Sequence, residues 1–494
     1  MSLASFPRDF YFGFSISSFQ FEMGGPGTLD EGSDWWVWVR DPSIVASGLV
    51  SGDLPEDGPG YWRLYREDHS LAESLGLDSA RLCVEWSRVF PRPTREVRVR
   101  VDREPDGSIV GVEVDSRALN EMDRLANKEA VERYREILSD WRRRGRLLIL
   151  NLNHFTLPSW IHDPIQLRRR GIGGAPGGWL DKSTVVEFAK YAAYIAWKLG
   201  DLVDVWSTMN EPNALYTASY VNVKSGFPPG IPGLDLAVGA ARNMAEAHAR
   251  AYDAIKSIDG KPVGIIYVFT AFEPLDGGHE DAARAASEAF NYSFLDSITR
   301  GSSLLVGDRS DLKGRLDWLG VNYYTRAVVK GDGKGLGFKV VRGYGPECTP
   351  NALSLDGRPC SDIGWEVYPE GLYHVLRAVH ERYGLDILVT ENGVADSTDR
   401  IRPAFIASHI YQVGRALGEG VRVRGYLHWS LIDNYEWAHG FSMRFGLAHV
   451  DYSTKRRRLR PSALVYKTIS TEKAVPDELE HLAKPPALDA RLSI

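Results

Sequence analysis

Hydrophobic and polar positions alternate between two patterns along the chain. Short, almost uniformly apolar runs predict buried strands at residues 10–17, 80–86, 147–154, 203–210, 263–269, 316–324, 387–391 and 424–430. Apolar residues at the spacing of a helix face predict helices at 61–75, 127–144, 184–198, 237–258, 368–382 and 405–417. Strands that alternate with amphipathic helices indicate a parallel sheet. Eight such units predict an α/β fold, a (β/α)₈ TIM barrel.

Two irregular segments interrupt this alternation. Residues 92–124 are charged and aperiodic, and residues 165–178 contain a run of arginines followed by glycines. We interpret both as loop insertions in the barrel, mainly at its C-terminal face. No low-complexity linker divides the chain, so we expect a single catalytic domain over residues 1–494. The segment after Ser470 is expected to wrap the surface or to join a subunit contact.

Polar and aromatic residues gather where the predicted strands end, which is where barrel enzymes place their active sites. Glu211 follows the fourth strand and Glu391 ends the seventh, so the two would face each other across the barrel mouth. Cleavage of a glycosidic bond needs such a pair, because one carboxylic acid protonates the departing oxygen and one carboxylate meets the cationic sugar. Neither glutamate alone would be informative, since a single strand-end Glu is often a cap or an ion-pair partner.

Composition narrows the class of protein. The 494 residues carry a net charge of −6, which provides no general attraction to nucleic acid or anionic membranes. No segment resembles a signal peptide or a membrane span, so a cytoplasmic protein is expected. The 14 Trp, 22 Tyr and 18 Phe could form core or stack on sugar rings, and composition alone does not separate these roles. The excess of Arg over Lys and the 26 prolines favour a thermostable protein.

The chain contains three cysteines, Cys83, Cys348 and Cys360. An odd number without metal-like spacing argues against a disulfide framework and against a zinc site. Cys348 and Cys360 could pair, but we expect free thiols.

Two strand-end segments carry a specific resemblance. Residues 208–212 (TMNEP) and 389–393 (VTENG) resemble the two signatures of glycoside hydrolase family 1. Further matching motifs follow in order along nearly the whole chain, at residues 12–13, 20–22, 81–88, 322–325, 369–372, 428–430, 436–437 and 444–447. Residues 51–54 and the insertion lengths are similar to the β-glycosidases of hyperthermophilic archaea. That group includes β-galactosidases and β-glucosidases, which are often tetrameric.

The resemblance implies an activity and residue roles. It implies a retaining β-glycosidase that hydrolyses terminal non-reducing β-D-glucosides and β-D-galactosides by double displacement, with possible transglycosylation. Glu391 would be the nucleophile, oriented by Arg81 and Tyr324, and Glu211 the general acid and then the general base. Substrate-binding roles would fall to Gln20, His154, Asn210, Trp429, Glu436, Trp437 and Phe445.

The resemblance also sets expectations about cofactors and partners. No metal or organic cofactor is implied. The expected partners are small-molecule β-glycosides or oligosaccharides and further copies of the chain in a tetramer or dimer, with neither nucleic acid nor membrane.

The sequence departs from the family pattern at one position and leaves alternatives open. The family usually has Trp where this chain has Phe155, which leaves the sugar preference undecided. Glu436 replaces the Ser found in relatives that act on 6-phosphorylated sugars, so an unphosphorylated sugar is expected. Arg81 could instead be a buried partner of Glu85 alone. The alternative functions are another barrel glycosidase or transglycosidase with the same carboxylate pair, a non-catalytic sugar-binding relative, and a purely structural or interaction protein.

Overall fold

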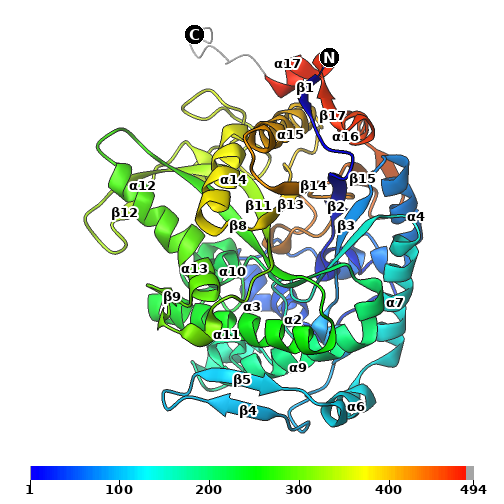
Figure 1. Cartoon of the computed structure of the whole chain (residues 1–494), viewed down its shortest axis with the longest axis vertical. Coiled ribbons are helices and arrows are strands. Elements are labelled where there is room, and N and C mark those ends of the chain that lie inside the picture. Colours follow the sequence, from blue (N-terminus) through cyan, green and yellow to red (C-terminus); the bar gives the residue numbers. More distant parts are fainter. Residues whose placement is uncertain (1, 485–494) are drawn as a thin grey trace.

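A computed structural model describes residues 2–484, and its centre is a closed parallel barrel (Figure 1). The barrel strands are β2 (Tyr11–Ser15), β3 (Ser79–Cys83), β6 (Leu147–Asn151), β7 (Val205–Asn210), β8 (Val263–Pro274), β11 (Trp318–Gly331), β13 (Asp386–Asn392) and β14 (Val423–His428). Each pairs in parallel with the next, and the pairing of β14 with β2 closes the ring. All eight predicted strands are present, which confirms the (β/α)₈ barrel.

Helices surround the barrel and shield its strands from solvent (Figure 1). The six predicted helices are confirmed as α4 (Tyr61–Ser74), α7 (Lys128–Arg142), α9 (Lys182–Leu199), α11 (Leu234–Ile258), α14 (Pro369–Tyr383) and α15 (Arg402–Gly418). Capping residues and prolines account for where some of these helices begin. The Asn127 side chain accepts from the Ala130 amide at the start of α7, and Pro369 occupies the first turn of α14. The outer ring also contains α13 (Ser293–Arg300) and α16 (Pro461–Glu472), which were not predicted.

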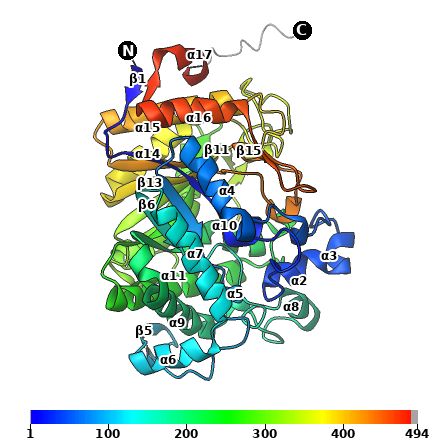
Figure 2. The same cartoon turned by 90° about the vertical axis from the view of Figure 1, so that its right-hand side faces the viewer.

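The two insertions lie in different places. Within residues 92–124, β4 (Arg100–Arg103) and β5 (Ile109–Glu113) form a hairpin followed by α6 (Ser116–Leu125). Strand β5 packs against α9 and α11, and α6 packs against α9, at the lower edge of Figure 1. The second insertion begins with α8 (Pro164–Arg170). It lies with α2 (Asp34–Arg40) and α3 (Pro42–Ala46) on one side of the barrel (Figure 2).

The two ends of the described chain meet. Strand β17 (Ala474–Pro476) pairs antiparallel with β1 (Ser2–Ser5), and α17 (Glu480–Ala483) packs on α15. The prediction that the C-terminal segment wraps the surface is confirmed for residues 471–484, whereas residues 485–494 lie outside the described part. No helix within residues 2–484 is long and apolar enough to cross a membrane.

The expectation of free thiols at Cys348 and Cys360 is wrong, because the structure joins them in a disulfide. The intervening segment turns back on itself, with the Cys360 amide donating to the Ala352 carbonyl at 2.9 Å, and this fold brings the two Cα atoms to 6.3 Å. Cys83 is free and buried.

Candidate active site

A cavity of about 810 Å³ opens at the C-terminal ends of the barrel strands. Nine of the predicted site residues line it, namely His154, Asn210, Glu211, Tyr324, Glu391, Trp429, Glu436, Trp437 and Phe445. The other two, Arg81 and Gln20, lie behind this lining and are bonded to it. The structure therefore brings every predicted site residue to one place. Residues 48–51, which follow α3, form part of the rim.

Glu391 is buried at the end of β13 between two donors. Arg81, on β3, forms an ion pair with one of its oxygens, and the Tyr324 hydroxyl donates to the other at 2.5 Å. Both interactions favour the ionised carboxylate. The alternative pairing of Arg81 with Glu85 is not found; Glu85 accepts instead from the Thr156 hydroxyl at 2.6 Å.

Glu211 occupies the turn between β7 and α10 (Pro212–Tyr220). Its backbone is left-handed, with φ of 45°, a conformation that non-glycine residues rarely adopt outside tight turns and functional sites. The Asn322 amide donates to its carboxyl at 2.6 Å. Burial raises the pKa of Glu211 to about 7, against the smaller lowering effects of the Asn322 hydrogen bond and the Arg81 charge. At neutral pH this carboxyl therefore retains a proton in a large fraction of molecules, and it can donate that proton.

The deep end of the cavity combines rings with polar groups. The His154 ring stacks near-parallel to Trp429 and Trp437, with centroids 5.9 and 5.8 Å away. The Gln20 amide donates to Glu436 at 3.2 Å. Burial, with the nearby Glu211 charge, raises the pKa of Glu436 to about 8. Planar rings beside hydrogen-bonding groups suit a sugar, whose ring has apolar faces and a polar edge.

His154 is a neutral member of this site. Burial and the Arg81 charge hold its pKa well below the ordinary value. Its Nδ1 therefore accepts from Arg81 at 2.7 Å, while Asn210 lies 3.3 Å from its Nε2. His154 thus joins the surroundings of Glu391, through Arg81, to the deep end of the cavity.

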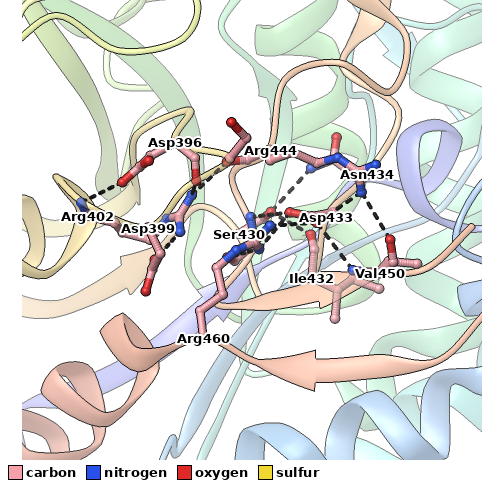
Figure 3. Close-up of polar contacts among 12 residues, drawn as sticks. Asp396, Asp399, Arg402, Ser430, Ile432, Asp433, Asn434, Arg444, Val450 and Arg460 are labelled. Atoms are coloured by element: carbon pink, nitrogen blue, oxygen red, sulfur yellow. Dashed lines mark hydrogen bonds and ion pairs between the residues drawn. The ribbon is translucent and has the colours of Figure 1, made fainter. Parts of the chain in front are cut away.

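A buried ion cluster supports the loop that follows β14 and carries Trp429, Glu436, Trp437 and Phe445 (Figure 3). At its centre, the Asp433 carboxylate accepts from both terminal nitrogens of Arg460 at 2.9 and 3.0 Å, and from Arg444 at 3.1 Å. The Gly446 and Val450 amides donate to it as well. Next in sequence, Asn434 accepts from the Gln20 amide at 3.0 Å, so the cluster is one residue away from a contact with the deep end of the cavity.

Several residues at the site were not predicted as site residues. Asn322, which donates to Glu211, lies near the end of the sixth predicted strand, and this position could have identified it. Trp365 lies in an irregular loop, where no periodicity marks it. Phe155 lines the cavity 5.2 Å from the Trp437 ring. His428 belongs to the matching motif at residues 428–430 but does not line the cavity; its ring packs 5.8 Å from that of Tyr466. Within residues 2–484, no group of three or more His, Cys, Asp or Glu side chains is arranged to hold a metal ion.

Comparison with known proteins places this fold and cavity in one family. The family model described as Glycosyl hydrolase family 1 matches residues 2–99 and 122–475. The β-galactosidase of Saccharolobus solfataricus is 53% identical over 98% of both chains, and that of Sulfolobus acidocaldarius 51% identical over 98% of this chain and 99% of its own.

Solved structures show the same relationship. The β-glycosidase of the hyperthermophile Thermosphaera aggregans superposes with a TM-score of 0.94 at 56% identity, covering 97% of this chain and 99% of its own. The chain therefore belongs to glycosyl hydrolase family 1, and it is an O-glycosyl hydrolase of the β-glycosidase type.

Proposed function

We propose that this enzyme is a retaining β-glycosidase with Glu391 as nucleophile and Glu211 as acid and base. One observation carries the proposal: the two buried carboxyl groups have opposite surroundings. Arg81 and Tyr324 both donate to Glu391, which favours its anion. Glu211 has one amide donor and a pKa raised by burial to about 7, which favours its acid form. Environments that separate the protonation of two carboxyl groups are the usual basis of acid and nucleophile assignments.

The proposed reaction has two steps. Glu391 attacks the anomeric carbon while Glu211 transfers its proton to the departing oxygen, and a covalent glycosyl-enzyme forms. Glu211, now ionised, then removes a proton from water, which attacks the anomeric carbon and releases the sugar with its configuration retained. The same intermediate can pass its sugar to another hydroxyl compound, which is transglycosylation. The reaction requires no metal or organic cofactor.

The terminal sugar is proposed to occupy the deep end, and the leaving group the mouth. Trp429, Trp437 and Glu436 would contact the terminal sugar, with Gln20 and His154 beside them, and Asn210 would bond its 2-hydroxyl. Phe445 would form a wall. β-D-Glucosides and β-D-galactosides are the proposed substrates, because relatives named β-galactosidase and β-glucosidase both match more than nine-tenths of the chain. Burial and the Glu211 charge raise the pKa of Glu436 to about 8, so the proposal of an unphosphorylated sugar does not rest on repulsion between a phosphate and this carboxyl.

The test is the kinetics of Glu391→Ala on aryl β-glucoside, β-galactoside, β-mannoside and 6-phospho-β-glucoside. We expect the wild type to cleave the first two, and the variant to lose more than about 10⁴-fold in kcat. Azide should restore turnover in the variant and produce the inverted α-glycosyl azide. The control is Glu381→Ala on the exposed side of α14, which should retain turnover without any response to azide. Wild-type activity in Glu391→Ala would refute the mechanism, and an inactive wild type would favour the non-catalytic sugar-binding relative.

We also propose that residues 1–494 act as one catalytic domain and that copies of the chain assemble into a tetramer or dimer. A solved β-glucosidase mutant described as derived from a hyperthermophilic tetrameric structure is 50% identical, with a TM-score of 0.92, over 97% of this chain and 98% of its own. Light scattering on the purified protein would give the mass. A monomer at all concentrations would contradict the assembly.

A further inference from the structure

The loop of residues 341–368, between β12 (Phe338–Val340) and α14, borders the mouth of the cavity with both of its arms. Its first arm contributes Pro346 and Glu347, and its second contributes Ile363 and Trp365. Pro346 and Glu347 are exposed, whereas Trp429 and Trp437 at the deep end are buried. The loop therefore faces the part of a substrate that extends out of the barrel.

The disulfide Cys348–Cys360 joins the two arms directly beside these lining residues. Both cysteines are buried, and backbone hydrogen bonds connect the arms as well, among them the one from the Cys360 amide to the Ala352 carbonyl at 2.9 Å. The Asn351 amide donates to the Ser361 carbonyl at 3.1 Å. At Gly364 the arms pass so close that a Cβ would lie 2.6 Å from the Cys348 carbonyl oxygen. Removal of the cross-link would leave only noncovalent contacts between the arms, over a segment whose ends are 12 residues apart in sequence.

The base of the loop is held independently of the disulfide. Glu366 is fully buried and accepts from Arg326 on β11 through both of its oxygens at 2.9 Å. Arg326 also pairs with Asp356, inside the segment that the disulfide closes. Loss of the disulfide would therefore loosen the arms without detaching the loop from the barrel.

Aromatic contacts connect the second arm, through Trp365, to residues of the catalytic centre. The Trp365 ring lies 5.3 Å from that of Tyr324 and 6.3 Å from that of Phe445. Tyr324 has its own anchor, the hydrogen bond to Glu391, so its position depends less on the loop than that of Trp365 does. A displacement of the arms would thus alter the mouth more than the nucleophile.

We propose that the Cys348–Cys360 disulfide is a positioning element that fixes the leaving-group side of the cavity and makes the preference for leaving groups dependent on redox state. This inference rests on the proposed glycosidase function. Reduction by a dithiol breaks the S–S bond. Two electrons and two protons pass from the dithiol to the cysteine sulfurs, the chain gains two thiols, and the dithiol becomes a cyclic disulfide. With the arms loosened, leaving groups that must contact the mouth should bind less well in the transition state.

The experiment compares oxidised enzyme, dithiol-reduced enzyme and the double variant Cys348→Ser/Cys360→Ser, with thiol titration to establish each state. Two substrates separate the effects: a β-1,4-linked glucose disaccharide and 2,4-dinitrophenyl β-glucoside, whose leaving group departs with little assistance. In reduced enzyme and in the double variant, we expect kcat/KM for the disaccharide to fall about tenfold through misplacement of the leaving group. The kcat for the dinitrophenyl glucoside, which reports hydrolysis of the glycosyl-enzyme, should stay unchanged.

The double variant also serves as the control for the reductant, because it retains Cys83 and should show no response to dithiol. Hydrogen exchange provides a readout without activity: amides of residues 341–365 should exchange faster after reduction, and those around β13 should not. Equal loss on both substrates would mean general destabilisation and would overturn the proposal, as would unchanged kinetics and exchange in the double variant. An oxidised enzyme inactive on every β-glycoside would refute the proposed function instead, leaving hydrogen exchange to decide whether the disulfide holds the loop.

Discussion

At the residue scale, the asymmetry between Glu211 and Glu391 has a consequence for pH dependence. In the proposed mechanism Glu211 must be protonated to donate to the leaving group, and its pKa of about 7 means that this form is present at lower pH and lost as pH rises through that value. We therefore expect kcat/KM for a disaccharide to decline above about pH 7. In Asn322→Ala the decline should begin at higher pH, because the lost hydrogen bond favoured the ionised form.

A matched substrate separates Glu211 from other ionisable groups. The leaving group of 2,4-dinitrophenyl β-glucoside departs without protonation, so its kcat/KM should lack the alkaline decline. If the decline has the same midpoint with both substrates, it belongs to another group, and the acid role of Glu211 is contradicted.

Most of the predicted site residues lie at the end of a strand or shortly after one. Because all strands of a parallel barrel point the same way, their ends meet in space, and residues far apart in sequence, such as Arg81 and Glu391, become neighbours. The sequence pattern contains this information. Trp365 and the Cys348–Cys360 pair could not be predicted in this way, since an irregular loop has no period that places its side chains. The roles of the site residues stay predictions until the variants are measured.

At the element scale, the positions of the strands and of six helices were predictable, because apolar runs and amphipathic spacing indicate them locally. The lengths of β8 and β11 were not predictable. These strands continue pairing past the barrel, from Arg326 opposite Ala271 to Val329 opposite Pro274, where they depend on each other and on β12. Hydrophobic period alone does not reveal an extension that partner strands stabilise.

The ion cluster around Asp433 allows a test of whether the loop after β14 positions the residues at the deep end of the cavity. In Asp433→Asn, a neutral amide would replace a buried carboxylate that faces Arg460 and Arg444, and breaking a buried pair costs about 3–5 kcal/mol. We expect a lower melting temperature. We also expect kcat/KM to fall by about 10- to 100-fold at temperatures where the variant is folded, because Glu436 and Phe445 would shift.

Asp386→Asn is the matched control for this cluster. Asp386 also pairs with two arginines, Arg422 and Arg424, but it is 42% exposed and lies at the opposite end of its strand from Glu391. Exposed ion pairs contribute about 0–1 kcal/mol to stability, so this variant should have nearly the melting temperature and kcat/KM of the wild type. If the folded Asp433→Asn variant has the same kcat/KM as Asp386→Asn, the cluster contributes to stability alone and does not position the residues that line the cavity.

At the scale of the whole molecule, the chain closes on itself away from the active site. Strand β1 pairs with β17 near the C-terminal end of the described residues, and both lie against α15 (Figures 1 and 2). Two glycines of α15 allow a test of this closure with one substitution. A Cβ on Gly414 would lie 2.5 Å from the Ala4 Cβ of β1, whereas a Cβ on Gly418 would meet no heavy atom within 4 Å.

Glycine to alanine inside a helix should stabilise it by up to about 1 kcal/mol. Gly418→Ala should therefore be neutral or slightly stabilising. In Gly414→Ala the gain is opposed by overpacking against β1, which costs about 1–3 kcal/mol, so this variant should unfold at lower temperature than Gly418→Ala. Neither variant should change kcat, since neither glycine lines the cavity. The test is to measure the melting temperature of each variant by thermal unfolding, and its kcat at a temperature well below the unfolding transition. Equal melting temperatures would mean that β1 moves aside at no cost and that the terminal strand pair contributes little to stability.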